Sequence, residues 1–151
     1  MKVILNDGGR RAAGYIGLAR GDCVCRAIAI AAQLPYQQVY DALADINART
    51  PASKRRKAHK VGRRTASDGI YTTSVLFKRY MASLGFVWTP TMGIGTGCKV
   101  HLRSGELPKG RLIARVTRHY CAVIDGVIHD THDCSRHGTR CVYGYWKRKE
   151  V

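Results

Sequence analysis

An Asp-Gly pair near the C-terminus constrains the fold of this chain more than any other feature. The flanking segments, HYCAVI (119–124) and VIHDTH (127–132), are rich in the β-branched and aromatic residues that favour strands. An Asp-Gly pair between two such segments is typical of a type I′ turn, in which both central residues take positive φ. The sequence therefore predicts an antiparallel hairpin that turns at 125–126 and pairs Ile124 with Val127.

The predicted turn also fixes which residues of the hairpin face one another. Outward from the turn, Cys121 faces Asp130 and His119 faces His132. Directly paired residues point to the same side of a sheet, and diagonal neighbours lie about 7 Å apart at the backbone. His119 and Asp130 are such diagonal neighbours, so we expect their side chains to meet, whereas His129 falls on the opposite face.

A histidine beside a carboxylate is half of a nucleophilic site, because the carboxylate orients the imidazole and stabilises its charged form. The stretch GDCVCRAIAIAAQ (21–33) offers the nucleophile. Asp22 is a good N-cap, which places Cys23 at the first helical residue. Free N–H groups and the helix dipole favour a thiolate at that position. Cys25 lies further along the helix and is expected to pack in the core.

The remaining elements predict an α+β fold in which N-terminal helices pack on a C-terminal antiparallel sheet. Helical periodicity and capping residues predict helices over about 22–34, 35–48 and 72–84, with Gly85 as the C′ residue of the third. Strands are expected at 2–5, 111–116 and 140–146, in addition to the hairpin. A length of 151 residues fits one domain, 1–151.

Composition changes sharply at about 51–67, where we expect a basic surface loop or arm. The formal net charge of the chain is +16, which favours acidic partners. An alternative function is therefore a non-enzymatic protein on the same fold that grips nucleic acid or an acidic protein through this segment. The candidate polyanion-binding residues are Lys54, Arg55, Arg56, Lys57, Lys60, Arg63 and Arg64.

The order of the predicted elements resembles that of papain-like cysteine peptidases. In that family a cysteine opens a buried N-terminal helix, and a histidine-bearing strand precedes a strand that carries the orienting side chain. The residues that carry the resemblance are GDCVCRAIA (21–29), RHYCAVIDG (118–126) and VIHDTHD (127–133), and they look closest to compact bacterial and phage relatives.

The resemblance implies a papain-like fold with Cys23 as nucleophile, His119 as base and Asp130 as orienting acid. The chain departs from papain itself, because it has no CGSCW stretch and no glutamine shortly before the nucleophile. The backbone N–H of Cys23 is the expected first oxyanion donor. Because the glutamine is missing, Asn6 and the Asp22 region are the remaining candidates for a second donor.

These observations predict a cysteine-dependent hydrolase or acyl transferase of the peptidase, isopeptidase or deamidase type. The expected substrate is a protein or peptide, and an acidic one suits the basic surface. No cofactor and no membrane partner are expected. A zinc site is the rival interpretation of the cysteines and histidines, but their spacing matches no pair of CxxC knuckles and they alternate across the predicted sheet, so we expect no metal. The rival ligands are Cys23, Cys25, His129, His132, Cys134, His137 and Cys141.

The compartment is expected from the N-terminus and the cysteine content. The first residues, MKVILNDGGRR, lack the apolar segment of a signal peptide, and no apolar run reaches the length of a membrane helix. We therefore expect a cytoplasmic protein, in the host cytoplasm if phage-encoded, whose six cysteines are mostly free thiols.

Overall fold

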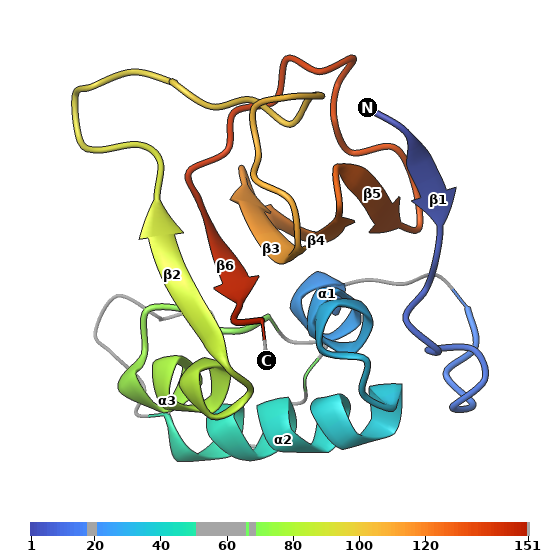
Figure 1. Ribbon diagram of the computed structural model, residues 1–151. Helices are drawn as coiled ribbons and strands as arrows, with labels where there is room; N and C mark the ends of the chain where they lie inside the picture. The colour runs from blue at the N-terminus through green and yellow to red at the C-terminus, as the bar shows by residue number, and fades with distance from the viewer. Residues whose placement is uncertain (18–20, 51–65, 67–68, 151) are drawn as a thin grey trace.

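The computed structural model describes residues 1–17, 21–50, 66 and 69–150. The predicted basic arm at about 51–67, with its candidate polyanion-binding residues Lys54 to Arg64, lies outside the described residues except for Ala66. The α+β class is confirmed, because three described helices pack against one six-stranded sheet (Figure 1).

The helices lie together on one side of the sheet (Figure 1). They are α1 (Cys23–Ala32), α2 (Tyr36–Arg49) and α3 (Val75–Ser83). The strands follow the order β1-β5-β4-β3-β6-β2 across the sheet. Their bounds are β1 (Val3–Leu5), β2 (Phe86–Pro90), β3 (Arg111–Val116), β4 (His119–Ile124), β5 (Val127–Asp130) and β6 (Gly144–Arg148).

The expectation of a purely antiparallel, C-terminal sheet is wrong. β1 pairs in parallel with β5, and β2, which was not predicted, pairs antiparallel with β6. β1, which was predicted at 2–5, and β2 both lie at the edges of the sheet. β1 is only three residues long and β2 ends at Pro90. The proline at the end of β2 is tolerated because β2 is an edge strand, where one side needs no N–H donor.

The hairpin prediction is confirmed in register and in turn conformation. Asp125 and Gly126 have φ values of 48° and 80°. Ile124 pairs with Val127, and the ladder continues through Val123 with Ile128 and Ala122 with His129. β5 ends at Asp130, so His132 lies beyond the strand instead of inside it.

The two faces of the sheet carry separate apolar clusters. Ile113, Ala122 and Trp146 pack with the helices, and α1 is buried along nearly its whole length between the sheet and α2. The alternate residues, including Leu112 and Val123, face the other way. Loops with no described helix cover that second face, through Leu102, Cys134 and Val142.

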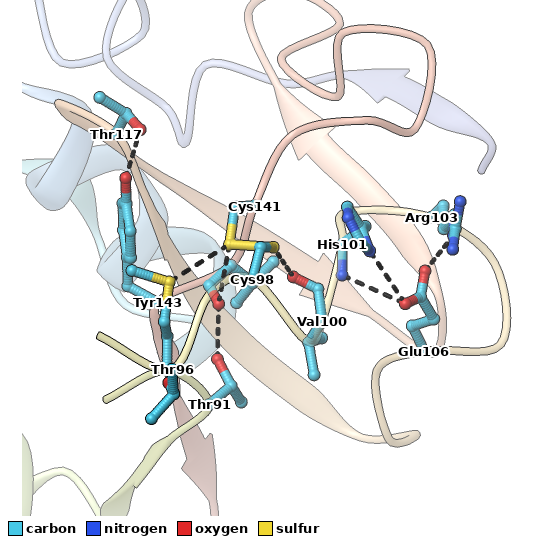
Figure 2. Close-up of a disulfide and its surroundings, with 12 residues drawn as sticks. Thr91, Thr96, Cys98, Val100, His101, Arg103, Glu106, Thr117, Cys141 and Tyr143 are labelled. Carbon is cyan, nitrogen blue, oxygen red and sulfur yellow. Dashed lines mark hydrogen bonds and ion pairs between the residues drawn. A yellow bond between two sulfur atoms is a disulfide. The ribbon is translucent and has the colours of Figure 1, made fainter. Parts of the chain in front are cut away.

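A disulfide joins two of these covering loops. Cys98 and Cys141 are bonded to each other across 43 residues of sequence, and Figure 2 shows the bond beside the hydrogen bond between Thr117 and Tyr143. The expectation of mostly free thiols therefore fails for these two cysteines and holds for the other four, which are Cys23, Cys25, Cys121 and Cys134. Cys141 is also removed from the zinc ligands considered above.

The described helices do not include one that combines the length and the apolar character needed to cross a membrane.

Candidate active site

The centre of the candidate site is a short hydrogen bond between His119 and Asp130. His119 opens β4 and Asp130 closes β5, so both lie at the same end of the sheet. The His119 Nε2 atom is 2.6 Å from Asp130 Oδ2. The second carboxylate oxygen of Asp130 accepts a hydrogen bond from the backbone N–H of Thr131 at 2.7 Å. The pair predicted from the hairpin register is therefore present in the structure.

Cys23 lies at the same end of the molecule, where α1 begins. Its side chain is half-buried and lines a cleft of about 540 Å³ together with His119. The cleft is bounded by the first turn of α1, residues 69–73 and the turn between β3 and β4. The structure thus brings Cys23, His119 and Asp130 together from two regions almost one hundred residues apart in sequence.

The surroundings of His119 keep its imidazole protonated. Burial lowers the pKa of this histidine, but hydrogen bonds with the Asp130, Cys134 and Cys23 side chains outweigh burial and raise the pKa to about 11. The imidazolium is therefore the resting form at neutral pH. An imidazolium beside a cysteine is the arrangement that activates thiols in nucleophilic enzymes.

Asp130 is ionised for the complementary reason. Burial raises the pKa of its carboxyl group, but the hydrogen bond and charge of His119, the N–H of Thr131 and the charge of Arg26 lower the pKa below its ordinary value. The orienting carboxylate thus carries its negative charge in the same pH range in which His119 carries its positive charge.

Arg26 is a member of the site that sequence reasoning missed. This residue of α1 is only 5% exposed. Its guanidinium forms a close ion pair with Asp22 and lies 3.7 Å from Asp130 Oδ1. Arg26 therefore links Asp22, which precedes Cys23, to Asp130, which binds the His119 ring. The available signal was an Asp-Arg pair four residues apart in an otherwise apolar helix.

The side chains of the two oxyanion candidates, Asp22 and Asn6, bind other groups. Asp22 is fully buried, and its carboxylate binds Arg26, Arg10 and the hydroxyl of Tyr36. The side-chain amide of Asn6 donates to His129 Nδ1 at 3.4 Å, and its oxygen accepts from the N–H of Gly8 at 2.8 Å. Neither residue lines the cleft that holds Cys23. The backbone N–H of Cys23, at the end of α1 that lines the cleft, remains as a candidate donor toward a developing oxyanion.

A second thiol also contacts the His119 ring. Cys134 hydrogen-bonds with Cys121, and this bond, together with His119, lowers the pKa of Cys134 despite its burial. Cys134 is 2% exposed and does not line the cleft, whereas Cys23 does. Cys25 is fully buried, and burial raises its pKa to about 12. Cys23 therefore differs from the other free thiols in that a molecule in the cleft can reach its sulfur.

The residues that could hold a metal ion overlap this site. One ligand atom from each of His119, Asp130 and His132 lies within 4.8 Å of the others. The larger zinc set considered from the sequence is divided by the structure, because His129 lies on the other face and Cys141 is in the disulfide. A cation bound by these three residues would take up the same imidazole that binds Asp130.

Comparisons of the chain with protein-family models, with curated proteins and with solved structures gave no match.

Proposed function

We propose that this protein is a cysteine-dependent hydrolase or acyl transferase with a papain-like arrangement of its elements. The single observation that carries the proposal is the convergence of Cys23, His119 and Asp130 at one end of the sheet, with Cys23 and His119 on a shared cleft. The nucleophile opens a buried helix, and the base and its acid lie on adjacent strands. This layout supports the papain-like assignment.

In the acylation step, the sulfur of Cys23 attacks the carbonyl carbon of an amide or ester. An S–C bond forms, and the carbonyl oxygen becomes an oxyanion near the N-terminal end of α1, where the backbone N–H of Cys23 stabilises the charge. His119 then donates its proton to the leaving nitrogen or oxygen as the C–N or C–O bond breaks. A thioester on Cys23 and the protonated leaving group result.

In the deacylation step, His119 acts as the base. The hydrogen bond with Cys23 is one of the interactions that raise the pKa of His119, and acylation of the sulfur weakens it. The pKa of the imidazole therefore falls in the thioester, which suits it to take a proton from water or from an acceptor amine. Asp130 holds the ring in position in both steps through its 2.6 Å hydrogen bond.

The proposal is tested with p-nitrophenyl acetate, a small activated ester that needs no specific recognition. We expect a burst of p-nitrophenol and an acetyl group located on Cys23 by mass spectrometry. Cys23→Ser abolishes the burst, whereas Cys25→Ser, a matched change two residues further along α1, leaves it. Adding a primary amine separates transfer to an amine from hydrolysis.

Two results would contradict the proposed function. Absence of an acetyl group on Cys23, or a burst of equal size and rate in His119→Ala, would show that the cysteine and the histidine do not act together.

A further inference from the structure

The cleft beside Cys23 has a basic wall. Arg115 at the end of β3 and Arg118 in the turn to β4 both line it, and Arg118 directly precedes His119. Among the residues that the structure describes, neither guanidinium has an ion-pair partner and no acidic side chain lines this cleft. As far as the described residues go, both cations are available to a negative group that enters the cleft.

A second pocket continues from the same wall. It measures about 340 Å³ and shares Thr72, Thr73, Arg115 and Tyr120 with the first cleft. Lys78, Trp88 and Trp146 complete its lining, and the two indole rings lie 5.3 Å apart. The surface that extends from Cys23 to this second pocket thus combines cationic and aromatic side chains.

The backbone of Arg118 takes a conformation that arginine adopts less easily than glycine. Arg118 has a φ of 54°, in the left-handed region that glycine and asparagine adopt most easily. An arginine at this position of a two-residue turn is unfavourable for the backbone. The side chain is exposed, so core packing does not account for it.

We propose that the cleft selects acyl substrates with a carboxylate next to the reacting carbonyl, as in an acidic peptide segment. Arg115 and Arg118 bind that carboxylate, and the Trp88–Trp146 pocket with Lys78 accepts the adjoining part of the substrate. This inference rests on the proposed function of Cys23.

The test compares two alkylating reagents of nearly equal size, anionic iodoacetate and neutral iodoacetamide, on the full-length protein. In both reactions the sulfur of Cys23 forms an S–C bond and iodide leaves, so the ratio of the two rate constants reports the charge around the thiol. We expect Arg118→Gly and Arg115→Gln each to lower the ratio of iodoacetate to iodoacetamide rates about threefold at low salt, as expected for one charge about 7 Å away in water. The effect shrinks with added salt.

Arg136→Gly is the matched control. Arg136 is also exposed and also has a positive φ, of 51°, but it lines neither pocket. Its replacement removes the same charge and leaves the ratio unchanged. This inference alone is overturned if the ratio falls equally in Arg136→Gly. It is also overturned if the ratio falls in neither cleft variant while iodoacetamide still labels Cys23. Failure of both reagents at Cys23 overturns the proposed function and this inference with it.

Discussion

The guanidinium of Arg26 lies 3.7 Å from the Asp130 carboxylate, inside the protein. The acid that orients His119 is therefore held by a cation on each side, one from the sheet and one from α1. Because Arg26 also pairs with Asp22, it fixes the end of the helix that presents Cys23 relative to the strand that carries Asp130.

Replacing Arg26 tests this link. Arg26→Met leaves Asp22 and Asp130 without a shared buried cation, and we expect the free energy of unfolding to fall by about 3 kcal/mol, as for other broken buried ion pairs. Urea denaturation measures the change. Arg49→Met is the matched control, because Arg49 and Asp45 form an exposed pair with the same spacing in α2. The control loses less than about 0.5 kcal/mol. Equal losses in the two variants would show that Arg26 has no special role.

The charge of Asp130 controls the protonation of His119. Asp130→Asn keeps the shape of the side chain but removes the charge, so the pKa of His119 falls from about 11 toward the range of an ordinary imidazole. Titration of the ring by NMR measures this shift. In the unmodified protein we expect the ring to remain protonated at pH 9, and in the variant we expect it to titrate below that pH. The signals of His101, which pairs with Glu106 away from the site, check that the fold is intact.

The same pair makes stability depend on pH. The pKa of His119 is raised above the unfolded value of 6.5, so its contribution is complete below pH 6.5 and is lost as pH rises toward 11. The pKa of Asp130 is lowered, so its contribution is present above the unfolded value and is lost in acid. The stability difference between the unmodified protein and His119→Gln should therefore narrow between pH 7 and pH 10. A constant difference over that range contradicts the raised pKa.

The disulfide between Cys98 and Cys141 stabilises the loops that cover the second face of the sheet. A link that closes a loop of this size contributes about 2 to 4 kcal/mol, mainly by restricting the unfolded chain. We expect dithiothreitol to lower the urea midpoint of the unmodified protein. The double variant Cys98→Ser, Cys141→Ser should unfold at the lower midpoint with or without the reductant. A midpoint insensitive to reductant in both proteins would show that the bond does not contribute.

Features with local chemical causes could be predicted from the sequence. The Asp125-Gly126 turn determined the hairpin register, because both residues accept positive φ, and the register placed His119 beside Asp130. α1 begins at Cys23 as predicted, but the expected cap is absent, because the Asp22 side chain makes no capping hydrogen bond and binds Arg26, Arg10 and Tyr36 instead. The hairpin predictions needed only turn geometry and strand alternation.

Features that depend on contacts distant in sequence could not be predicted. The parallel pairing of β1 with β5 depends on how the chain returns across the sheet. The contact of Arg26 with Asp130 depends on how α1 packs against β5. The partner of Cys98 was equally undetermined, since six cysteines carry no local sign of which two will meet.

The central claim is that Cys23 is a nucleophile activated by His119, and site-resolved alkylation tests it most directly. The protein is treated with iodoacetamide at neutral pH, and the four free cysteines are followed separately by mass spectrometry. We predict that Cys23 reacts much faster than Cys25, Cys121 or Cys134, and that His119→Ala slows Cys23 at least about tenfold, as for loss of a paired base. Slow labelling of Cys23 at the rate of the buried thiols, unchanged by His119→Ala, would contradict the account.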